Sequence, residues 1–177
     1  MKVITGTHRG RVLQTLEGEE TRPTAQRVKE GLFSAIQFEI EGRQVLDLFA
    51  GSGQLGIEAL SRGAAGCLFI DRNPDAAAIV RSNLVALGLT ANTRVVCQDS
   101  LAYLAHAKEP FDLVFLDPPY AAGLLEPALT AVAPLVREGG VIVCESESDT
   151  PLPEQVGGAS LYRRYRYGRV TVRIYRV

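Results

Sequence analysis

One stretch, Val45 to Gly56, constrains the fold more than any other part of the chain. It opens with an apolar run long enough for a buried strand, Val45–Phe49, and it closes with apolar residues at helical spacing. Between the two lies a small glycine-rich turn, Ala50–Gly53, which leaves free backbone N–H groups at the start of a helix. Because such groups stabilise the negative groups of a ligand, the stretch predicts a strand, a tight turn and a helix with a binding site at the turn.

The glycines of this turn also match a known ligand-binding pattern. Gly51, Gly53 and Gly56 form G-x-G-x-x-G, and Asp71 follows about 20 residues after the first glycine, as in dinucleotide-binding folds. The same glycines equally suit a helix-capping turn in an ordinary α/β domain. The choice between possible cofactors must therefore come from the rest of the chain.

The length of 177 residues and the hydrophobic content of 46% suit one domain with a full core. We expect a single domain, in which an extension over residues 1–40 precedes a cofactor-binding and catalytic core over residues 41–177. The sequence contains no run of about 18 apolar residues, so it predicts no membrane span. The start of the chain lacks the apolar core of a signal peptide. The three cysteines lie in apolar runs without C-x-x-C spacing, which favours buried thiols in a reducing cytoplasm over disulfides or zinc: Cys67, Cys97 and Cys144.

The net charge of −1 conceals two basic ends around an acidic middle. Residues 1–30 carry six Lys or Arg against four Glu, and residues 161–177 carry six Arg and no acid. Clusters of this kind bind the phosphates of nucleic acids, although an edge hairpin can also carry arginines to resist aggregation. On the first interpretation the phosphates are held by the arginines of residues 163–176 and by those of the N-terminal part, Arg9, Arg11, Arg22 and Arg27.

The N-terminal extension predicts a hairpin over residues 1–16, a polar loop and then a helix. An apolar stripe at helical spacing runs from Val28 to Ile36, and Thr24 suits the N-cap of this helix. Polar residues at the start of the helix come just before the core, so we expect them to cover its ligand: Arg22, Thr24 and Arg27.

From Val45 onward strand and helix patterns alternate, which is typical of a parallel sheet with helices on both faces. The predicted strands are 45–49, 67–71, 93–97, 112–116 and 141–145, and the predicted helices are 54–62, 74–86 and 124–136. Residues 161–167 and 169–177 then alternate around Gly168 and predict an antiparallel hairpin. Five parallel strands closed by an antiparallel pair differ from the six parallel strands of a dehydrogenase.

Four carboxylates mark the ends of the predicted strands: Asp47, Asp71, Asp99 and Asp117. In a doubly wound sheet, ligands bind outside the carboxyl ends of the strands. We expect Asp71 to accept both hydroxyls of a ribose, and Asp99 with the backbone of Ser100 to meet an adenine edge. Each acid alone also suits a helix cap or a turn, so it is the set of four that predicts a site.

The tetrapeptide Asp117-Pro118-Pro119-Tyr120 is the most informative of these strand ends. Its two prolines fix the backbone after the central strand, remove two donors and aim the carbonyl of Pro118. An acid, an aimed carbonyl and an aromatic ring together suit an exocyclic amino group, whose N–H groups need acceptors and whose base can stack. The alternative is a rigid loop with Tyr120 packed in the core.

These motifs resemble the class I S-adenosylmethionine-dependent methyltransferases that modify exocyclic amino groups. The likeness rests on Asp47–Gly53, Asp71, Asp99 and Asp117–Tyr120. Residues 4–11, 22–33 and 49–62 are further similar to the RsmD family, bacterial enzymes that methylate N2 of a guanine in 16S ribosomal RNA. The resemblance covers nearly the whole chain and is weakest over residues 150–177.

The resemblance implies a Rossmann-like α/β fold with a mostly parallel seven-stranded sheet, a C-terminal antiparallel hairpin and an N-terminal β-hairpin. It implies catalytic contacts to the target base from Asp117, Pro118 and Tyr120. The implied partner is 16S ribosomal RNA, within the small ribosomal subunit or an assembly intermediate, and the small size of the chain favours a monomer. We expect S-adenosylmethionine to be held by residues of the strand ends and the glycine turn, together with Thr24 and Arg72: Thr24, Asp47, Phe49, Gly51, Ser52, Gly53, Asp71, Arg72, Asp99 and Ser100.

Three other interpretations stay open on the sequence alone. An adenine-N6 methyltransferase of DNA or RNA uses the same Asp-Pro-Pro-Tyr chemistry, and only the N-terminal likeness argues against it. A nicotinamide oxidoreductase fits the glycine fingerprint but not the closing hairpin or the prolines. A non-catalytic RNA-binding module would keep the basic ends but has no need for four strand-end acids.

Overall fold

The computed structural model describes residues 1–16, 23–147 and 150–177. Their strands form one mixed sheet in the order β3-β2-β1-β4-β5-β8-β7-β6. Five strands are parallel: β1 (Gln44–Asp47), β2 (Gly66–Asp71), β3 (Thr93–Cys97), β4 (Phe111–Leu116) and β5 (Val136–Glu147). The remaining strands are antiparallel to their neighbours: β6 (Gln155–Val156), β7 (Ala159–Tyr167) and β8 (Val170–Arg176).

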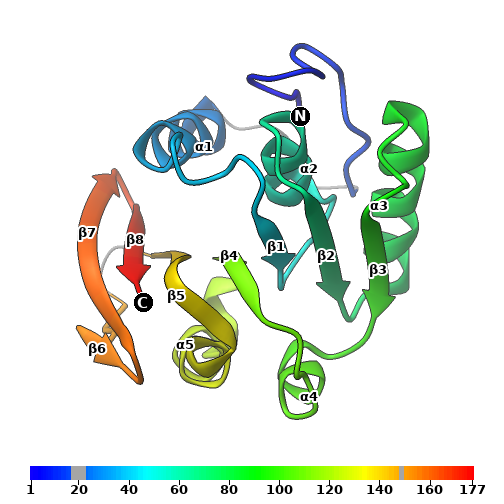
Figure 1. The fold of residues 1–177 in the computed structure, drawn as a ribbon. Helices are drawn as coiled ribbons and strands as arrows, with labels where there is room; N and C mark the ends of the chain where they lie inside the picture. Colours follow the sequence, from blue (N-terminus) through cyan, green and yellow to red (C-terminus); the bar gives the residue numbers. More distant parts are fainter. Residues whose placement is uncertain (17–22, 148–149) are drawn as a thin grey trace.

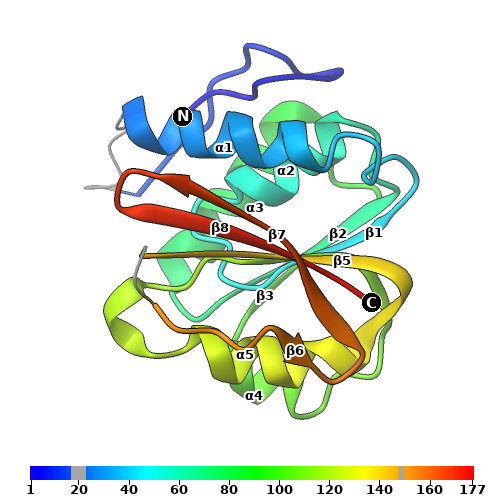
Figure 2. The same ribbon diagram turned by 90° about the vertical axis from the view of Figure 1, so that its left-hand side faces the viewer.

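Helices cover both faces of this sheet, as Figures 1 and 2 show. One face carries α1 (Pro23–Ala35), α2 (Gln54–Ser61) and α3 (Pro74–Leu87). The other carries α4 (Ser100–Leu104) and α5 (Leu125–Val132), together with the short 3-10 helices η1 (Tyr120–Ala122) and η2 (Ala133–Leu135). The fold class predicted from the sequence, a three-layer α/β arrangement with a closing antiparallel hairpin, is confirmed.

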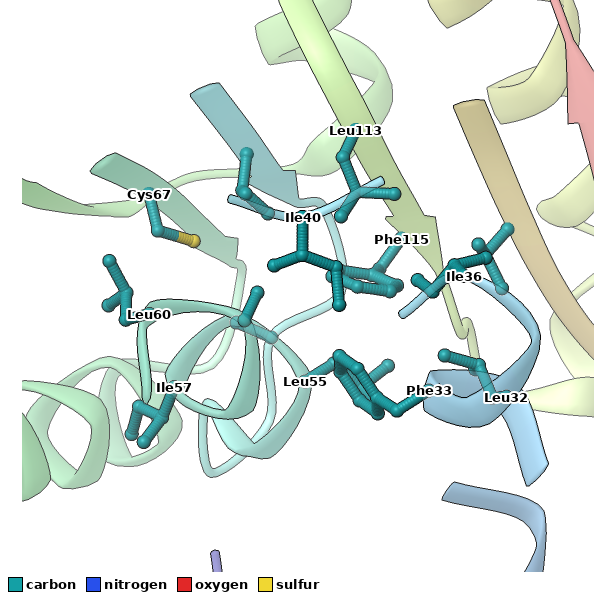
Figure 3. Packing of buried hydrophobic residues seen from close by; sticks show 14 of the residues in the cluster. Leu32, Phe33, Ile36, Ile40, Leu55, Ile57, Leu60, Cys67, Leu113 and Phe115 are labelled. Carbon is teal, nitrogen blue, oxygen red and sulfur yellow. The ribbon is translucent and has the colours of Figure 1, made fainter. Parts of the chain in front are cut away.

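Each face of the sheet buries its own apolar cluster. On the first face the rings of Phe33 in α1 and Phe115 in β4 lie 5.6 Å apart between centroids, and α2 packs beside them (Figure 3). A Cβ atom on Gly56 would lie 2.3 Å from the ring of Phe69 and 2.7 Å from Sγ of Cys67. The last glycine of the G-x-G-x-x-G pattern is therefore needed for the close approach of α2 to β2.

A buried carboxylate attaches the N-terminal segment to this domain. Glu58 of α2 is fully buried and accepts hydrogen bonds from the backbone N–H groups of Ile4 and Thr5 at 2.7 and 3.0 Å. Its charge is balanced by Lys29 at 3.2 Å and Arg62 at 2.9 Å. Because a buried charge is stable only when it is paired, these contacts fix the segment and α1 against α2.

Several details differ from the sequence-based predictions. The two-residue strand β6 makes the sheet eight-stranded, and the N-terminal hairpin is reduced to one isolated bridge between Lys2 and Val12. The helix predicted over 124–136 ends at Val132 because Pro134 has no N–H to continue it. Helix α1 begins at Pro23, so Thr24 lies inside the helix instead of capping it.

Two of the three cysteines are buried as predicted, and one prediction was wrong. Cys67 and Cys144 are buried, whereas Cys97 is exposed because β3 is an edge strand. Among the described residues, no helix is both long and apolar enough to cross a membrane.

Candidate active site

A cleft of about 480 Å³ lies at the carboxyl ends of β1, β2, β3 and β4. It brings together nine of the residues predicted from the sequence: Phe49, Gly51, Asp71, Arg72, Asp99, Ser100, Asp117, Pro118 and Tyr120. Pro119 and Leu124 complete its wall. These residues come from four separate strand ends, so only the sheet topology makes them neighbours.

The turn after β1 forms one side of the cleft. Gly53 is the N-cap of α2 with φ of 79°, a left-handed conformation that side-chain-bearing residues rarely adopt. A Cβ atom on Gly53 would point toward Val80 and Ile57, so this residue shapes the turn without lining the cleft. Ser52 lies in a smaller pocket of about 80 Å³, which also touches Asp47, Gly51 and Asp117.

Asp47 is buried behind this turn and accepts a hydrogen bond from the N–H of Gly56 at 2.9 Å. Burial raises the pKa of Asp47 to about 7, although the bond from Gly56 opposes the shift. The carboxyl group therefore fixes the first turn of α2 and closes the floor of the small pocket.

Asp71 connects two of the loops that line the cleft. Its Oδ2 accepts a hydrogen bond from the N–H of Gly51 at 2.8 Å, and its Oδ1 accepts one from the N–H of Asn73 at 2.8 Å. An ionised carboxylate has about four acceptor positions, so both oxygens can also accept the hydroxyls of a diol. The same side chain thus orders the glycine turn and faces the cleft.

Asp99 and Ser100 place the loop after β3 in the cleft. Asp99 is the N-cap of α4, and its Oδ1 accepts from the N–H of Ala102 at 2.9 Å. The hydroxyl of Ser100 donates to the carbonyl of Leu48 at 2.7 Å, so it is used to join this loop to the end of β1. The helix-cap role was one of the two alternatives that the sequence left open for Asp99, and here it coexists with a place in the cleft.

The loop after β4 forms the opposite wall. Pro118 is buried, whereas Tyr120 is 43% exposed, so its ring is not packed in the core. The hydroxyl of Tyr120 donates a hydrogen bond to Oε1 of Glu145 at 2.8 Å. Burial and the nearby carboxylates of Glu145 and Asp117 raise the pKa of Tyr120, so the phenol stays protonated and keeps this bond.

Two polar residues of this region were missed by the sequence reasoning. Glu145 ends the predicted strand 141–145, the same signal that singled out the four aspartates, and its pKa is raised by burial. Gln54, the first residue of α2, has a buried Oε1 that receives no hydrogen bond from any described residue, and the side chain lines the small pocket beside Gly51 and Asp117. Its position directly after the glycine turn was the signal that could have found it.

The residues predicted to bind RNA lie in different places. Arg11 donates to the carbonyl of Ala86 at 3.1 Å, at the C-terminal end of α3, whereas the cleft lies where α3 begins. Since a helix of 14 residues is about 21 Å long, Arg11 is well separated from the cleft. Arg9 and Arg27 are exposed, Arg22 lies outside the described residues, and the side chain of Thr24 is likewise outside them.

The arginines of the C-terminal hairpin divide into two groups. Arg173 is only 3% exposed and donates to Oγ of Ser146 and to the carbonyl of Thr150. The prediction that it binds phosphates was therefore wrong. Arg176 is paired with Glu39 and lies 3.8 Å from the ring centre of Tyr162. Arg176 is itself exposed, and the other exposed arginines of the hairpin are Arg163, Arg164, Arg166 and Arg169.

The tip of this hairpin shares an edge with the cleft. Glu147 at the end of β5 pairs with Val170 at the start of β8, so the turn around Gly168 lies at the carboxyl edge of the parallel strands. Arg166 and Arg169 flank that turn. The structure thus brings positive charge to the edge at which the cleft opens.

Sequence and structure comparisons identify relatives over nearly the whole chain. Residues 1–176 match the family described as "Conserved hypothetical protein 95". YlbH of Bacillus subtilis is 42% identical over 181 residues, covering 99% of this chain and 98% of that protein. The ribosomal RNA small subunit methyltransferase D of Escherichia coli K12 is 37% identical over 177 residues, covering 99% of this chain and 89% of that protein.

A solved structure gives the same assignment. The chain of YhhF from Escherichia coli superposes with a TM-score of 0.87 at 37% identity, covering 99% of this chain and 96% of that one. These findings confirm the predicted methyltransferase activity. The chain therefore belongs to the family of conserved hypothetical protein 95, together with the ribosomal RNA small subunit methyltransferase D proteins that its motifs resemble.

Proposed function

We propose that this chain transfers the methyl group of S-adenosylmethionine to N2 of a guanine in 16S ribosomal RNA. The observation that carries the proposal is the cleft itself, which joins a glycine turn and two strand-end acids to the Asp117–Tyr120 loop. The small-subunit methyltransferase D relatives support the choice of ribosomal RNA.

The cleft has the groups that an adenosine needs. Asp71 offers acceptors for the ribose hydroxyls, and the start of α4 at Asp99 and Ser100 offers polar groups to the adenine edge. Phe49 and Leu124 supply apolar surface for the ring. Arg72 is exposed at the rim of the same cleft.

The small pocket beside the turn suits the methionine part of the cofactor. Oε1 of Gln54 is a buried acceptor without a hydrogen bond from any described residue, which suits an ammonium group. The turn at Gly51 and Ser52 opens the N-terminus of α2, which stabilises a carboxylate. This pocket also touches Asp117, so the methionine part would end close to the target-base loop.

The cofactor supplies a methyl group on a sulfonium, which is a good leaving group, so the protein mainly has to align the acceptor nitrogen. We assign this task to Asp117 and the carbonyl of Pro118, each accepting one N–H of the guanine amino group. Both line the cleft, and Tyr120 beside them offers its ring for stacking. Holding the reacting atoms in line lowers the entropic part of the barrier. As the N–C bond forms and the bond between the methyl carbon and sulfur breaks, the amino nitrogen loses one proton to Asp117 or to water.

A base can enter this cleft only after it leaves its stack, and stacking on Tyr120 offsets part of that cost. Arg166 and Arg169 at the hairpin tip would hold phosphates near the cleft, with Arg27 on the exposed side of α1. Arg9 and Arg11 would hold phosphates further away, on the N-terminal segment. Such a spread of charge suits a large folded substrate, namely the cytoplasmic small subunit or its assembly intermediate, bound by a monomer.

The test is methyl transfer from labelled S-adenosylmethionine, followed by identification of the labelled nucleoside. Small ribosomal subunits from a strain without its own copy of the enzyme are compared with naked ribosomal RNA, transfer RNA and duplex DNA. We expect N2-methylguanosine from the ribosomal sample. N6-methyladenosine or its deoxy form would reassign the substrate, and no transfer to any sample would overturn the proposal.

A further inference from the structure

A second pocket, of about 190 Å³, lies directly beside the cofactor cleft. The two share four lining residues, Pro118, Pro119, Tyr120 and Leu124, so the Asp117–Tyr120 loop separates them. Sites for drug-sized ligands measure about 300–1,000 Å³, which makes this pocket suitable for a smaller group such as one planar base. The established cofactor does not need it, because the cleft alone provides about 480 Å³.

The far wall of the second pocket is held by buried side chains of β8. Arg173 donates to Oγ of Ser146 and to the carbonyl of Thr150, both at 2.7 Å, and Ser146 and Thr150 line the pocket. The hydroxyl of Tyr175 donates to the carbonyl of Pro153 at 2.9 Å. Because Arg173 and Tyr175 are 3% and 0% exposed, this wall is anchored in the protein interior.

Two carboxylates line this pocket, and Glu126 is exposed whereas Glu145 is half-buried. Glu145 lines it from the end of β5, and its Oε1 accepts the hydrogen bond of the Tyr120 hydroxyl. Pro118, Leu125 and Leu152 give much of the remaining surface. An ionised carboxylate accepts hydrogen bonds and donates none, so a ligand in this pocket should present an N–H or O–H group to Glu145.

We infer that the second pocket receives the target guanine and that Glu145 accepts the N1–H of its Watson–Crick edge. This inference rests on the proposed function and adds a specificity-determining residue to it. N1–H and the N2 amino group are adjacent on guanine, so a base held by Glu145 through N1–H turns N2 toward Asp117 and Pro118. The shared residues Pro118 and Tyr120 connect the two positions.

The same arrangement rejects adenine. Its N1 carries no proton, so it would place a lone pair against the carboxylate of Glu145 in a partly desolvated pocket. A hydrogen bond to a charged group contributes about 1.5–3 kcal/mol, which corresponds to a preference on the order of 10- to 100-fold. Guanine-over-adenine selection therefore comes from β5, outside the Asp-Pro-Pro-Tyr motif that both classes of enzyme share.

The experiment compares guanine with 2-aminopurine at the methylated position of reconstituted small subunits. 2-Aminopurine keeps the exocyclic amine but lacks the N1 proton. We expect the wild-type enzyme to methylate the guanine substrate 10- to 100-fold faster. In Glu145→Gln the amide oxygen can still accept from Tyr120 while its NH₂ group can donate to an unprotonated N1, so the preference for guanine should fall at least tenfold.

Glu147→Gln is the matched control, since Glu147 lies two residues further along β5, is exposed and does not line the pocket. Its preference for guanine should equal that of the wild-type enzyme. An unchanged preference in Glu145→Gln would overturn the inference, and so would equal rates on the two bases with the wild-type enzyme, which needs no variant to fold. Failure of the wild-type enzyme to methylate any guanine would instead overturn the proposed function.

Discussion

The hydroxyl of Tyr120 donates a hydrogen bond to Oε1 of Glu145 at 2.8 Å, which ties the loop after β4 to the end of β5. These two residues lie 25 positions apart, and they meet because β4 and β5 are parallel neighbours. The bond holds an otherwise exposed aromatic ring at the boundary between the cofactor cleft and the second pocket.

Two variants of Tyr120 should distinguish the contribution of this hydrogen bond to activity from the contribution of ring stacking. Tyr120→Phe keeps the aromatic face and loses the hydrogen bond, so we expect kcat/KM to fall about tenfold or less. Tyr120→Ala also removes base stacking, worth about 1–3 kcal/mol, and should lower kcat/KM further. Steady-state methyl transfer to small subunits measures both, and equal losses in the two variants would show that the ring does not stack.

Asp117→Ala should separate catalysis from cofactor binding. The residue faces the amino group in the proposed reaction, whereas Asp71 and Asp99 hold the cofactor, so we expect turnover to fall about 10²–10⁴-fold. The affinity for S-adenosylhomocysteine, measured by calorimetry, should stay within about threefold of the wild-type value, the scatter common for such comparisons. Parallel losses of affinity and turnover would argue against this division of roles.

Gln54→Ala tests the buried acceptor beside the glycine turn. Since Oε1 of Gln54 has no hydrogen bond from the described residues, its removal should leave the melting temperature of the free protein unchanged or slightly raised. Its proposed bond to the cofactor ammonium would be lost, which should weaken S-adenosylhomocysteine about 10- to 100-fold. Gln26→Ala is the control, because Gln26 bonds only to Glu30 on the exposed side of α1 among the described residues.

Asp47 should make stability depend on pH. Its pKa in the folded protein is about 7, above the value of about 4 in an unfolded chain, so the folded state holds the proton more tightly. The contribution of Asp47 is therefore fully present below pH about 4 and is lost as the pH rises through about 7. Denaturant titrations should show a larger loss of stability from pH 5 to pH 8 in the wild-type protein than in Asp47→Asn.

Such titrations compare a charged with an uncharged group at one position, because the Asn amide oxygen can still accept from the N–H of Gly56. Other titrating groups affect both proteins equally and cancel in the difference. The same pH dependence in the two proteins would mean that Asp47 does not carry the shift.

Arginines at the hairpin tip should contribute to RNA binding. We expect the double variant Arg166→Ala, Arg169→Ala to bind small subunits more weakly and to reduce the slope of log K against log salt by about 1–2. The pair Arg9→Ala, Arg11→Ala should act in the same direction. Arg94→Ala serves as a control, since Arg94 is paired with Glu109 on the opposite edge of the strands, and a slope equal to that of the control would exclude the tested pair.

Local patterns were enough for the parallel strands, the longer helices and most of the cleft, but they did not predict the five-residue helix α4 or the two-residue strand β6. The alternation of apolar runs and helical stripes predicted each parallel strand, and most strand ends were correct to within a few residues. The predicted length of β5 was too short, because Gly139 and Gly140 suggested a turn where the strand has already begun. The strand-end position of Asp71, Asp99 and Asp117 predicted their place in one cleft, since parallel strands end at a common edge.

Contacts between distant residues were beyond these patterns. The exposure of Arg173 could not be known from its sequence neighbours, because its burial depends on Ser146 and Thr150 across the sheet. The distance of Arg11 from the cleft follows from the way the N-terminal segment docks on Glu58 and the end of α3. Both depend on packing between elements that are far apart in the chain.

The sequence by itself determined the α/β class, the glycine turn, the strand-end acids and the rigid loop over residues 117–120, because each is written in adjacent residues or in a short period. Only the tertiary structure decided that Glu145 meets Tyr120, that Oε1 of Gln54 is buried and that a second pocket lies behind the loop. The physical reason is that hydrogen bonding and burial of a side chain are set by all elements packed around it, and sheet topology alone brings those elements together.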